Sequence, residues 1–155
     1  MRFLVFGAGV LGCNLTGNLF RAGKGVTLLA RGQWAESIRK DGLRIKDNLS
    51  PRMSVSRVPV VSELKPEDRY DVIFVVMRYT QLGSILDALL VNPTRNIVFV
   101  GNNVRSAALA ASLPEKNVLF AFASSAGHRE RGYVASVDLK RSPLGSFRAR
   151  RPMRS

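Results

Sequence analysis

Residues 6–15, FGAGVLGCNL, constrain the fold of this 155-residue chain more than any other stretch. Three glycines, Gly7, Gly9 and Gly12, have the spacing G-x-G-x-x-G between an apolar run and a helical apolar pattern. In such a turn the first glycine permits a tight bend, the second lets the backbone approach a pyrophosphate, and the third lets helix and strand pack closely. The stretch therefore predicts a dinucleotide-binding loop at a helix N-terminus, where N–H groups face the phosphates. The alternative is a purely structural turn. We expect the other residues of the loop to join the site: Ala8, Val10 and Leu11.

Apolar runs and helical patterns alternate along the rest of the chain. Strands are expected at residues 2–6, 26–30, 43–45, 55–61, 71–77, 96–100 and 118–123. Helices are expected at residues 10–23, 34–40, 81–90 and 105–111. Strands that alternate with helices favour right-handed crossovers between parallel strands. We predict an α/β protein with a Rossmann-like, doubly wound, mostly parallel sheet and helices on both faces, forming one domain over residues 1–145.

Nearly half of the formal net charge of +13 lies at one end of the chain. Six of the 24 basic residues, and none of the 11 acidic ones, fall in residues 140–155. A basic tail of this kind can bind phosphate backbones nonspecifically. An end rich in Arg, Ser and Pro is also typical of a solvated, disordered segment. We expect residues 146–155 to be such a disordered basic tail, and nucleic-acid binding is the weaker alternative.

Other features of the composition exclude several classes of protein. No apolar run approaches the roughly 20 residues that a membrane-spanning helix needs, and the first residues do not form a secretory signal. The single cysteine, Cys13, cannot form an internal disulfide and belongs to no cluster of metal ligands. We therefore expect a cytoplasmic protein without a metal site and without a membrane partner.

The residue after the second predicted strand indicates which dinucleotide is bound. Enzymes that prefer NAD usually carry Asp or Glu at this point, where the carboxylate binds the ribose hydroxyls. Here the sequence is LLARGQW, and Arg31 takes that position. A guanidinium can pair with the 2′-phosphate of NADP through charge-assisted, often bidentate hydrogen bonds. We predict NADP(H) as the cofactor, bound in part by Arg31; the alternative is an arginine that points to solvent.

Five segments together resemble one known family. FGAGVLG, LLAR, VIFVVMRYTQ, IVFVGNN and AFASSAGHRE are similar to the N-terminal domain of the ketopantoate reductases (2-dehydropantoate 2-reductases) over roughly residues 1–145. The resemblance implies NADPH-dependent reduction of a 2-oxo acid to a 2-hydroxy acid, with ketopantoate in pantothenate synthesis as the best-known substrate. It also implies that Asn102 lies near the nicotinamide and the substrate carbonyl. Arg78 stands where the family usually has a lysine near the cofactor; the charge is kept, but a planar fork replaces a point donor.

In that family a helical C-terminal domain follows, which supplies a lysine as general acid and a glutamate that helps hold the substrate. These 155 residues contain no counterpart of that domain. A general acid near the developing alkoxide contributes roughly two to four orders of magnitude to the rate. His128, the only histidine, is a conceivable acid, although an exposed loop position beside Arg129 and Glu130 is the stronger expectation.

Two functional classes remain for a chain with predicted cofactor-binding residues and no counterpart of the helical domain. The first is the cofactor-binding half of an NADP-dependent oxidoreductase, which acts on a small-molecule 2-oxo acid once a helical domain completes the cleft. Alone, this half is expected to bind NADPH and to turn over slowly or not at all. The second is a stand-alone NADP-binding or sensor module, or an inactive truncated remnant, without turnover. A sheet domain without its partner also exposes apolar surface, which favours association into a homo-oligomer.

Overall fold

The computed structural model describes residues 1–101, 106–123, 125–138 and 147–148. The strands are β1 (Arg2–Phe6), β2 (Gly25–Leu29), β3 (Leu43–Asp47), β4 (Met53–Ser56), β5 (Val60–Val61), β6 (Val72–Val75), β7 (Asn96–Val100), β8 (Asn117–Ala121), β9 (Ser125–Glu130), β10 (Tyr133–Asp138) and β11 (Phe147–Arg148). The helices are α1 (Val10–Arg21), α2 (Gly32–Asp41), α3 (Tyr79–Leu82), α4 (Leu86–Val91) and α5 (Ser106–Ser112), with a 3₁₀ turn, η1 (Gly83–Ile85). Asn102 and most of the predicted tail lie outside the described residues.

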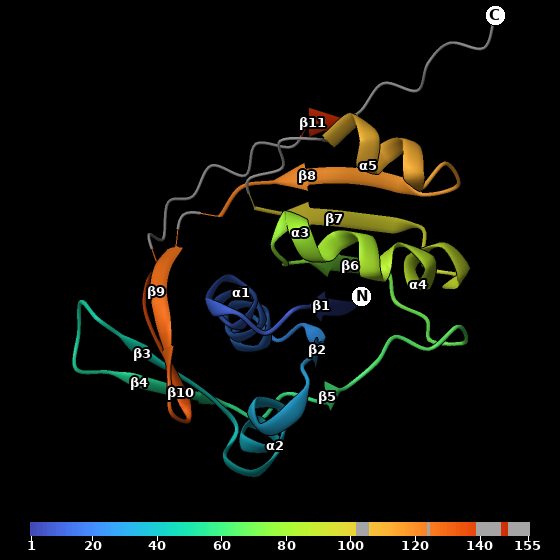
Figure 1. Cartoon of the computed structure of the whole chain (residues 1–155). Helices are drawn as coiled ribbons and strands as arrows, with labels where there is room; N and C mark the ends of the chain where they lie inside the picture. The colour runs from blue at the N-terminus through green and yellow to red at the C-terminus, as the bar shows by residue number, and fades with distance from the viewer. Residues whose placement is uncertain (102–105, 124, 139–146, 149–155) are drawn as a thin grey trace, which may run out of the picture.

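The main sheet contains seven strands in the order β11-β8-β7-β6-β1-β2-β5. From β8 to β5 all neighbours are parallel, and β11 pairs antiparallel with β8. Read from the β5 edge, the parallel strands are β5, β2, β1, β6, β7 and β8. If these six are renumbered 1 to 6 by their order in the chain, they lie as 3-2-1-4-5-6, which is the doubly wound arrangement (Figure 1). The predicted α/β fold with a mostly parallel sheet is confirmed. The short strand β11 falls inside the segment predicted as the tail.

Both faces of the main sheet are buried, as expected for continuous apolar runs in parallel strands. In β1, Phe3 and Val5 join a core that includes residues of α1 and α2. Leu4 and Phe6 join a second core that includes residues of α3, α4 and α5. One strand serves both cores because successive side chains point to opposite faces. The helices thus cover both faces of the sheet, as predicted.

Two predicted elements are divided, each for a physical reason. The expected strand at residues 55–61 is two strands, β4 and β5, which belong to different sheets. The chain leaves one sheet for the other near Pro59, which has no N–H to donate to a strand ladder. The expected helix at residues 81–90 begins earlier, at Tyr79, and consists of α3, η1 and α4. The division falls at Gly83, and glycine is a weak helix former.

A second sheet, which the sequence patterns do not predict, covers α1. Its strands lie in the order β4-β3-β10-β9; β3 and β10 are parallel, and the other pairs are antiparallel. The strand β9, with the sequence SAGHRE, lacks the alternation of apolar residues that would identify it as a strand. Because α1 packs against strands of both sheets, it lies between them (Figure 1).

A buried polar contact joins the second sheet to α1. Ser136 Oγ of β10 donates a hydrogen bond to Asn14 Oδ1 of α1 at 3.0 Å, and these residues are only 2% and 4% exposed. Asn14 Nδ2 is buried as well and has no acceptor among the described residues. A buried polar group that loses its partner keeps its desolvation cost. The Asn14 side chain therefore makes the junction sensitive to any change at Ser136.

Replacing Ser136 with alanine is expected to lower the free energy of unfolding by about 1–3 kcal/mol, because the buried Asn14 oxygen loses its donor. Urea unfolding followed by circular dichroism measures this difference. Ser112→Ala, which removes an exposed hydroxyl from α5, is the matched control and is expected to change the free energy of unfolding by less than about 0.5 kcal/mol. Equal losses for the two variants would contradict the assigned role of the buried contact.

Candidate nucleotide-binding site

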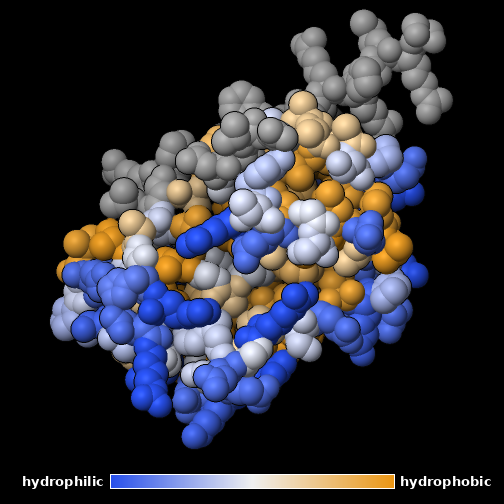
Figure 2. Space-filling model, viewed as in Figure 1, coloured by the Kyte–Doolittle hydropathy of each residue, from blue (hydrophilic) through white to orange (hydrophobic). Residues whose placement is uncertain are grey.

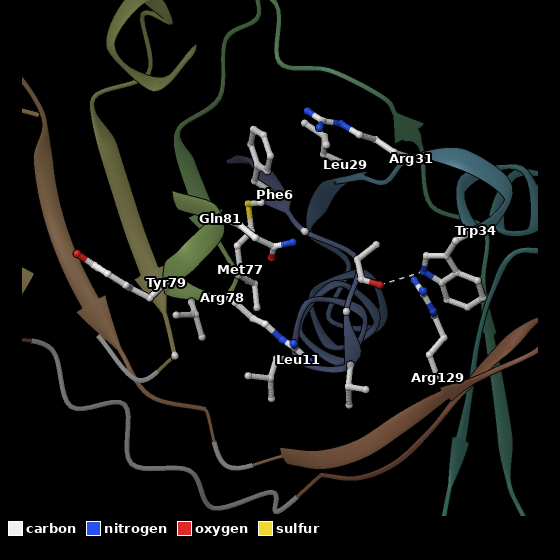
Figure 3. A pocket seen from close by; sticks show the side chains of 17 residues that line it. Phe6, Leu11, Leu29, Arg31, Trp34, Met77, Arg78, Tyr79, Gln81 and Arg129 are labelled. Carbon is white, nitrogen blue, oxygen red and sulfur yellow. Dashed lines mark hydrogen bonds between the residues drawn. The ribbon is translucent and has the colours of Figure 1, made fainter. Parts of the chain in front are cut away.

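A cleft of about 820 Å³ opens at the carboxyl edge of the main sheet. It lies where β1 meets β6, the position at which the strand order reverses and at which doubly wound folds bind ligands. The glycine loop, the ends of β1, β2, β6 and β7, and three arginines line it (Figure 3). On the face seen in Figure 2, hydrophilic side chains surround a paler, hollowed centre.

The packing of the loop requires glycine at two of its three glycine positions. Gly7 has a φ of 120°, in the left-handed region, and a Cβ there would lie 2.2 Å from the Val76 carbonyl oxygen. A Cβ on Gly12 would lie 1.9 Å from the Gly7 carbonyl oxygen. Neither distance is compatible with a side chain, and both neighbouring atoms belong to the backbone. Folding alone therefore explains Gly7 and Gly12.

Gly9 has no such packing requirement. Its φ is −76°, and a Cβ on it would meet no heavy atom within 4 Å. The open space belongs to the cleft, which Gly9 lines. A glycine that the fold does not need but that faces a cleft is explained by the close approach of a ligand. This position therefore favours a binding loop over a purely structural turn.

The N-terminus of α1 is suited to bind an anion. Gly9 is the N-cap of this 12-residue helix, no side chain caps it, and its first turn contains no acidic residue. The first N–H groups of a helix carry partial positive charge and bind anions such as phosphates. The cleft thus offers backbone donors beside the open position at Gly9.

Two side chains fix the orientation of the loop through one carbonyl group. The Ala8 carbonyl oxygen accepts a hydrogen bond from Trp34 Nε1 at 2.9 Å and from Cys13 Sγ at 3.4 Å. Burial raises the pKa of the Cys13 thiol to about 12, with smaller opposing effects from Trp34 and Arg129. The thiol therefore stays protonated at neutral pH and remains a donor. Trp34, the only tryptophan, ties α2 to the loop.

Three arginines from three parts of the chain give the cleft its charge. Arg31 follows β2 and is the N-cap of α2, Arg78 follows β6 and is the N-cap of α3, and Arg129 belongs to β9. Arg31 Nε donates to the Ser62 carbonyl oxygen at 3.2 Å, so its two terminal nitrogens remain for a ligand. Among the residues that the structure describes, no acidic side chain lines the cleft. Such a site attracts anionic ligands.

The structure brings most of the predicted site residues together. Those that line the cleft are Gly7, Ala8, Gly9, Val10, Leu11, Arg31 and Arg78. Gly12 lies behind the loop, where its role is packing against Gly7. Asn102 lies outside the described residues, and the preceding Gly101 lines the cleft.

His128 is placed differently from the sequence expectation. It is exposed, as expected, but it lies on β9 and not in a loop. Its Nε2 is 2.8 Å from Glu130 Oε1, and the histidine does not line the cleft. The arrangement gives no support to His128 as a proton donor at this site.

Among the cleft residues that sequence reasoning missed are two whose side chains contact each other, Trp34 and Arg129. Trp34 lies three residues after Arg31, so its place in the first turn of α2 was a usable signal. Arg129 had no such signal, because it reaches the cleft only through the second sheet. Their pairing, with Arg129 Cζ 5.4 Å from the centre of the Trp34 ring, depends on tertiary structure alone.

The part of the chain that the structure describes contains no group of three or more His, Cys, Asp or Glu side chains that could hold a metal ion. Within the same residues, no helix is both long enough and apolar enough to cross a bilayer.

Most of the chain matches one family of known proteins. Residues 3–148 match the family described as ketopantoate reductase PanE/ApbA. An uncharacterized oxidoreductase of Bacillus subtilis (strain 168), YkpB, is 33% identical over 87 residues, which are 56% of this chain and 28% of that protein.

Solved structures show the same fold. A PanE/ApbA family ketopantoate reductase from Ralstonia eutropha JMP134 superposes with a TM-score of 0.76 at 27% identity, over 87% of this chain and 46% of that one. A 2-dehydropantoate 2-reductase from Methylococcus capsulatus superposes with a TM-score of 0.73 at 21% identity, over 87% and 45%. The chain therefore spans less than half the length of each of these proteins.

The different requirements at Gly12 and Gly9 lead to a paired prediction. Gly12→Ala is expected to lower the free energy of unfolding by about 1–3 kcal/mol or more, because the added methyl group overlaps a backbone carbonyl that cannot move freely. Gly9→Ala is expected to change it by less than about 1 kcal/mol, because alanine fits the local backbone and restricts the unfolded chain, which offsets its weaker N-cap preference. Thermal unfolding without ligand compares the two variants. Similar destabilisation by both would mean that Gly9 is also required for packing.

Proposed function

The chain belongs to the ketopantoate reductase PanE/ApbA family, and from this premise we propose that it is the NADP(H)-binding part of an oxidoreductase that reduces a 2-oxo acid to a 2-hydroxy acid. The observation that supports this most is the open position at Gly9, beside the uncapped N-terminus of α1, in a cleft that three arginines line. A cofactor with a pyrophosphate and a 2′-phosphate matches both the helix N-terminus and the arginines. Ketopantoate, the substrate of the pantothenate pathway, is the first 2-oxo acid to test.

Each anionic part of the proposed cofactor has a matching group on the chain. The first N–H groups of α1 would hold the pyrophosphate, for which the missing side chain of Gly9 leaves room. Arg31 would bind the ribose 2′-phosphate with the terminal nitrogens that its bond to Ser62 leaves free. Arg78, at the end of β6, adds a positive charge from the other half of the sheet.

When bound, NADPH supplies the hydride, and the protein must then stabilise the oxygen of the reduced carbonyl. Arg78 lines the cleft and can offer N–H donors to an anionic substrate or its oxygen. Asn102, which we propose as a contact to the nicotinamide and the carbonyl, follows Gly101 of the cleft wall.

The proton donor is not evident in the cleft. Among the described residues that line it, none is a carboxylic acid, a histidine or a lysine. Tyr79 lines the cleft, but its hydroxyl points away from the glycine loop (Figure 3). We propose that a helical domain, as the family resemblance implies, supplies the acid and completes the substrate site.

A module that binds NADP without turnover is the second candidate. Every described residue that supports cofactor binding supports it equally, because none of these residues reports on proton transfer. A turnover assay with NADPH and ketopantoate, with and without a family helical domain, separates the two candidates.

Arg31→Ala is expected to weaken NADPH binding roughly ten- to hundredfold, because a charged hydrogen-bonding partner of a phosphate is worth about 1.5–3 kcal/mol. NADH lacks the 2′-phosphate, so its affinity is expected to change less than about threefold. Isothermal titration calorimetry of both cofactors measures the two effects. Arg39→Ala, in the same helix but outside the cleft, is the control for lost charge. If Arg31→Ala weakened both cofactors equally, the arginine would not be the 2′-phosphate ligand.

A further inference from the structure

Arg129 reaches the cleft from the second sheet because of the register of its strand. It lies opposite Val134 in the antiparallel ladder of β9 and β10. Residues directly opposite each other share one face of a sheet, and Val134 belongs to the core around α1. The Arg129 side chain therefore faces α1 and the glycine loop. His128 and Glu130 alternate to the other face, where they bind each other.

Trp34 determines where the Arg129 guanidinium lies. Arg129 Cζ is 5.4 Å from the ring centroid, within the range of a cation–π contact. The ring is itself held, because Trp34 Nε1 donates to the Ala8 carbonyl oxygen. Trp34 lies in the first turn of α2, and Arg31 is the N-cap of the same helix. Both arginines thus belong to the surroundings of one helix N-terminus: Arg31 is its N-cap and extends toward Ser62, and Arg129 lies over the Trp34 ring (Figure 3).

The guanidinium of Arg129 has no acceptor among the described residues. Their ion pairs are Arg39 with Glu36 and His128 with Glu130. Neither involves Arg129, and the neighbouring acid, Glu130, is on the opposite face of β9. A guanidinium has five N–H donors in a planar fork that matches phosphate oxygens. An exposed fork over an aromatic ring is suited to an anionic ligand, since no acidic side chain lines the described part of this cleft.

We propose that Arg129 is a second ligand of the ribose 2′-phosphate, beside Arg31. This inference rests on the proposed NADP(H)-binding function and adds a specificity-determining residue to it. The 2′-phosphate is assigned in preference to the pyrophosphate because Trp34 lies in α2 and Arg31 is its N-cap. This helix follows β2 and the expected ribose position, whereas the pyrophosphate is expected at α1. A phosphate with about two negative charges accommodates two guanidinium forks, and a ribose hydroxyl does not. The second sheet thereby becomes part of the cofactor site.

The test compares two arginines of one hairpin in the full 155-residue chain. Arg129→Ala removes the proposed ligand, and Arg131→Ala removes an equal charge from the exposed turn after β9, outside the cleft. NADPH and NADH are titrated at about 0.15 M salt, where distant charges are screened. Calorimetry gives the affinities, and the fluorescence of Trp34, the only tryptophan, reports binding at the site.

Arg129→Ala is expected to weaken NADPH roughly tenfold and NADH less than about twofold. Arg131→Ala is expected to change both affinities less than about twofold. Arg129→Lys keeps the charge without the fork and is expected to recover part of the NADPH affinity. In the double variant with Arg31→Ala, the two losses are expected to be less than multiplicative, because both residues bind one phosphate.

Two results would overturn the inference while leaving the proposed function standing. In the first, the wild-type chain binds NADPH, and Arg129→Ala weakens NADPH and NADH by the same factor. The other is a loss of NADPH affinity no larger than that of Arg131→Ala. If the wild-type chain bound neither cofactor, both the inference and the proposed function would fail. Thermal unfolding of each variant confirms that a lost affinity is not a lost fold.

Discussion

The close approach of α1 to the end of β1 is the contact on which the rest of the site depends. A hydrogen atom at Gly12 leaves room for the Gly7 carbonyl group, and any larger side chain would push the helix away from the strand. This contact sets the first turn of α1 at the carboxyl edge of the sheet, next to the position where the strand order reverses. The uncapped N–H groups and the open space at Gly9 then face one cleft. The second sheet holds α1 from its other side through Ser136 and Asn14.

The sequence predicted those parts of the fold that depend on local patterns. The glycine spacing, the apolar runs of the parallel strands and the position of Arg31 after β2 are all short-range features, and the main sheet with its helices follows from them. The strand predicted at residues 96–100 from the alternation of apolar runs and helices has the same bounds in the structure. These local patterns were sufficient to place the candidate nucleotide loop.

The parts that could not be predicted depend on contacts between distant segments. The strand β9 has mostly exposed, polar side chains, and it is a strand only because β10 pairs with it and α1 packs against it. The move of the chain from β4 to β5 likewise depends on which sheet each segment joins. For the same reason Arg129 and its contact with Trp34 were missed, since that contact joins residues 95 positions apart. Long-range pairing of this kind leaves no periodic signal in the sequence.

The positive charge of the cleft comes from arginines that the fold brings together from distant segments. Three positively charged side chains from β2, β6 and β9 line one cleft, and no acidic side chain among the described residues lines it with them. Like charges in one place oppose folding, so this grouping has no benefit for stability. It is explained if the cleft binds an anion, and the helix N-terminus of α1 points to the same kind of ligand. The hydrogen bond from Trp34 to the Ala8 carbonyl ties the glycine loop to the ring over which Arg129 lies.

The central claim is that an anionic dinucleotide, NADP(H), lies across the glycine loop and the N-terminus of α2. Hydrogen–deuterium exchange of the full chain with and without saturating NADPH tests this most directly, because it reports on each backbone amide separately. The account predicts slower exchange at residues 7–12 and 31–34, with no change in α4 or α5, which lie on the opposite face of the main sheet. Binding of NADPH that left exchange at residues 7–12 unchanged would contradict it.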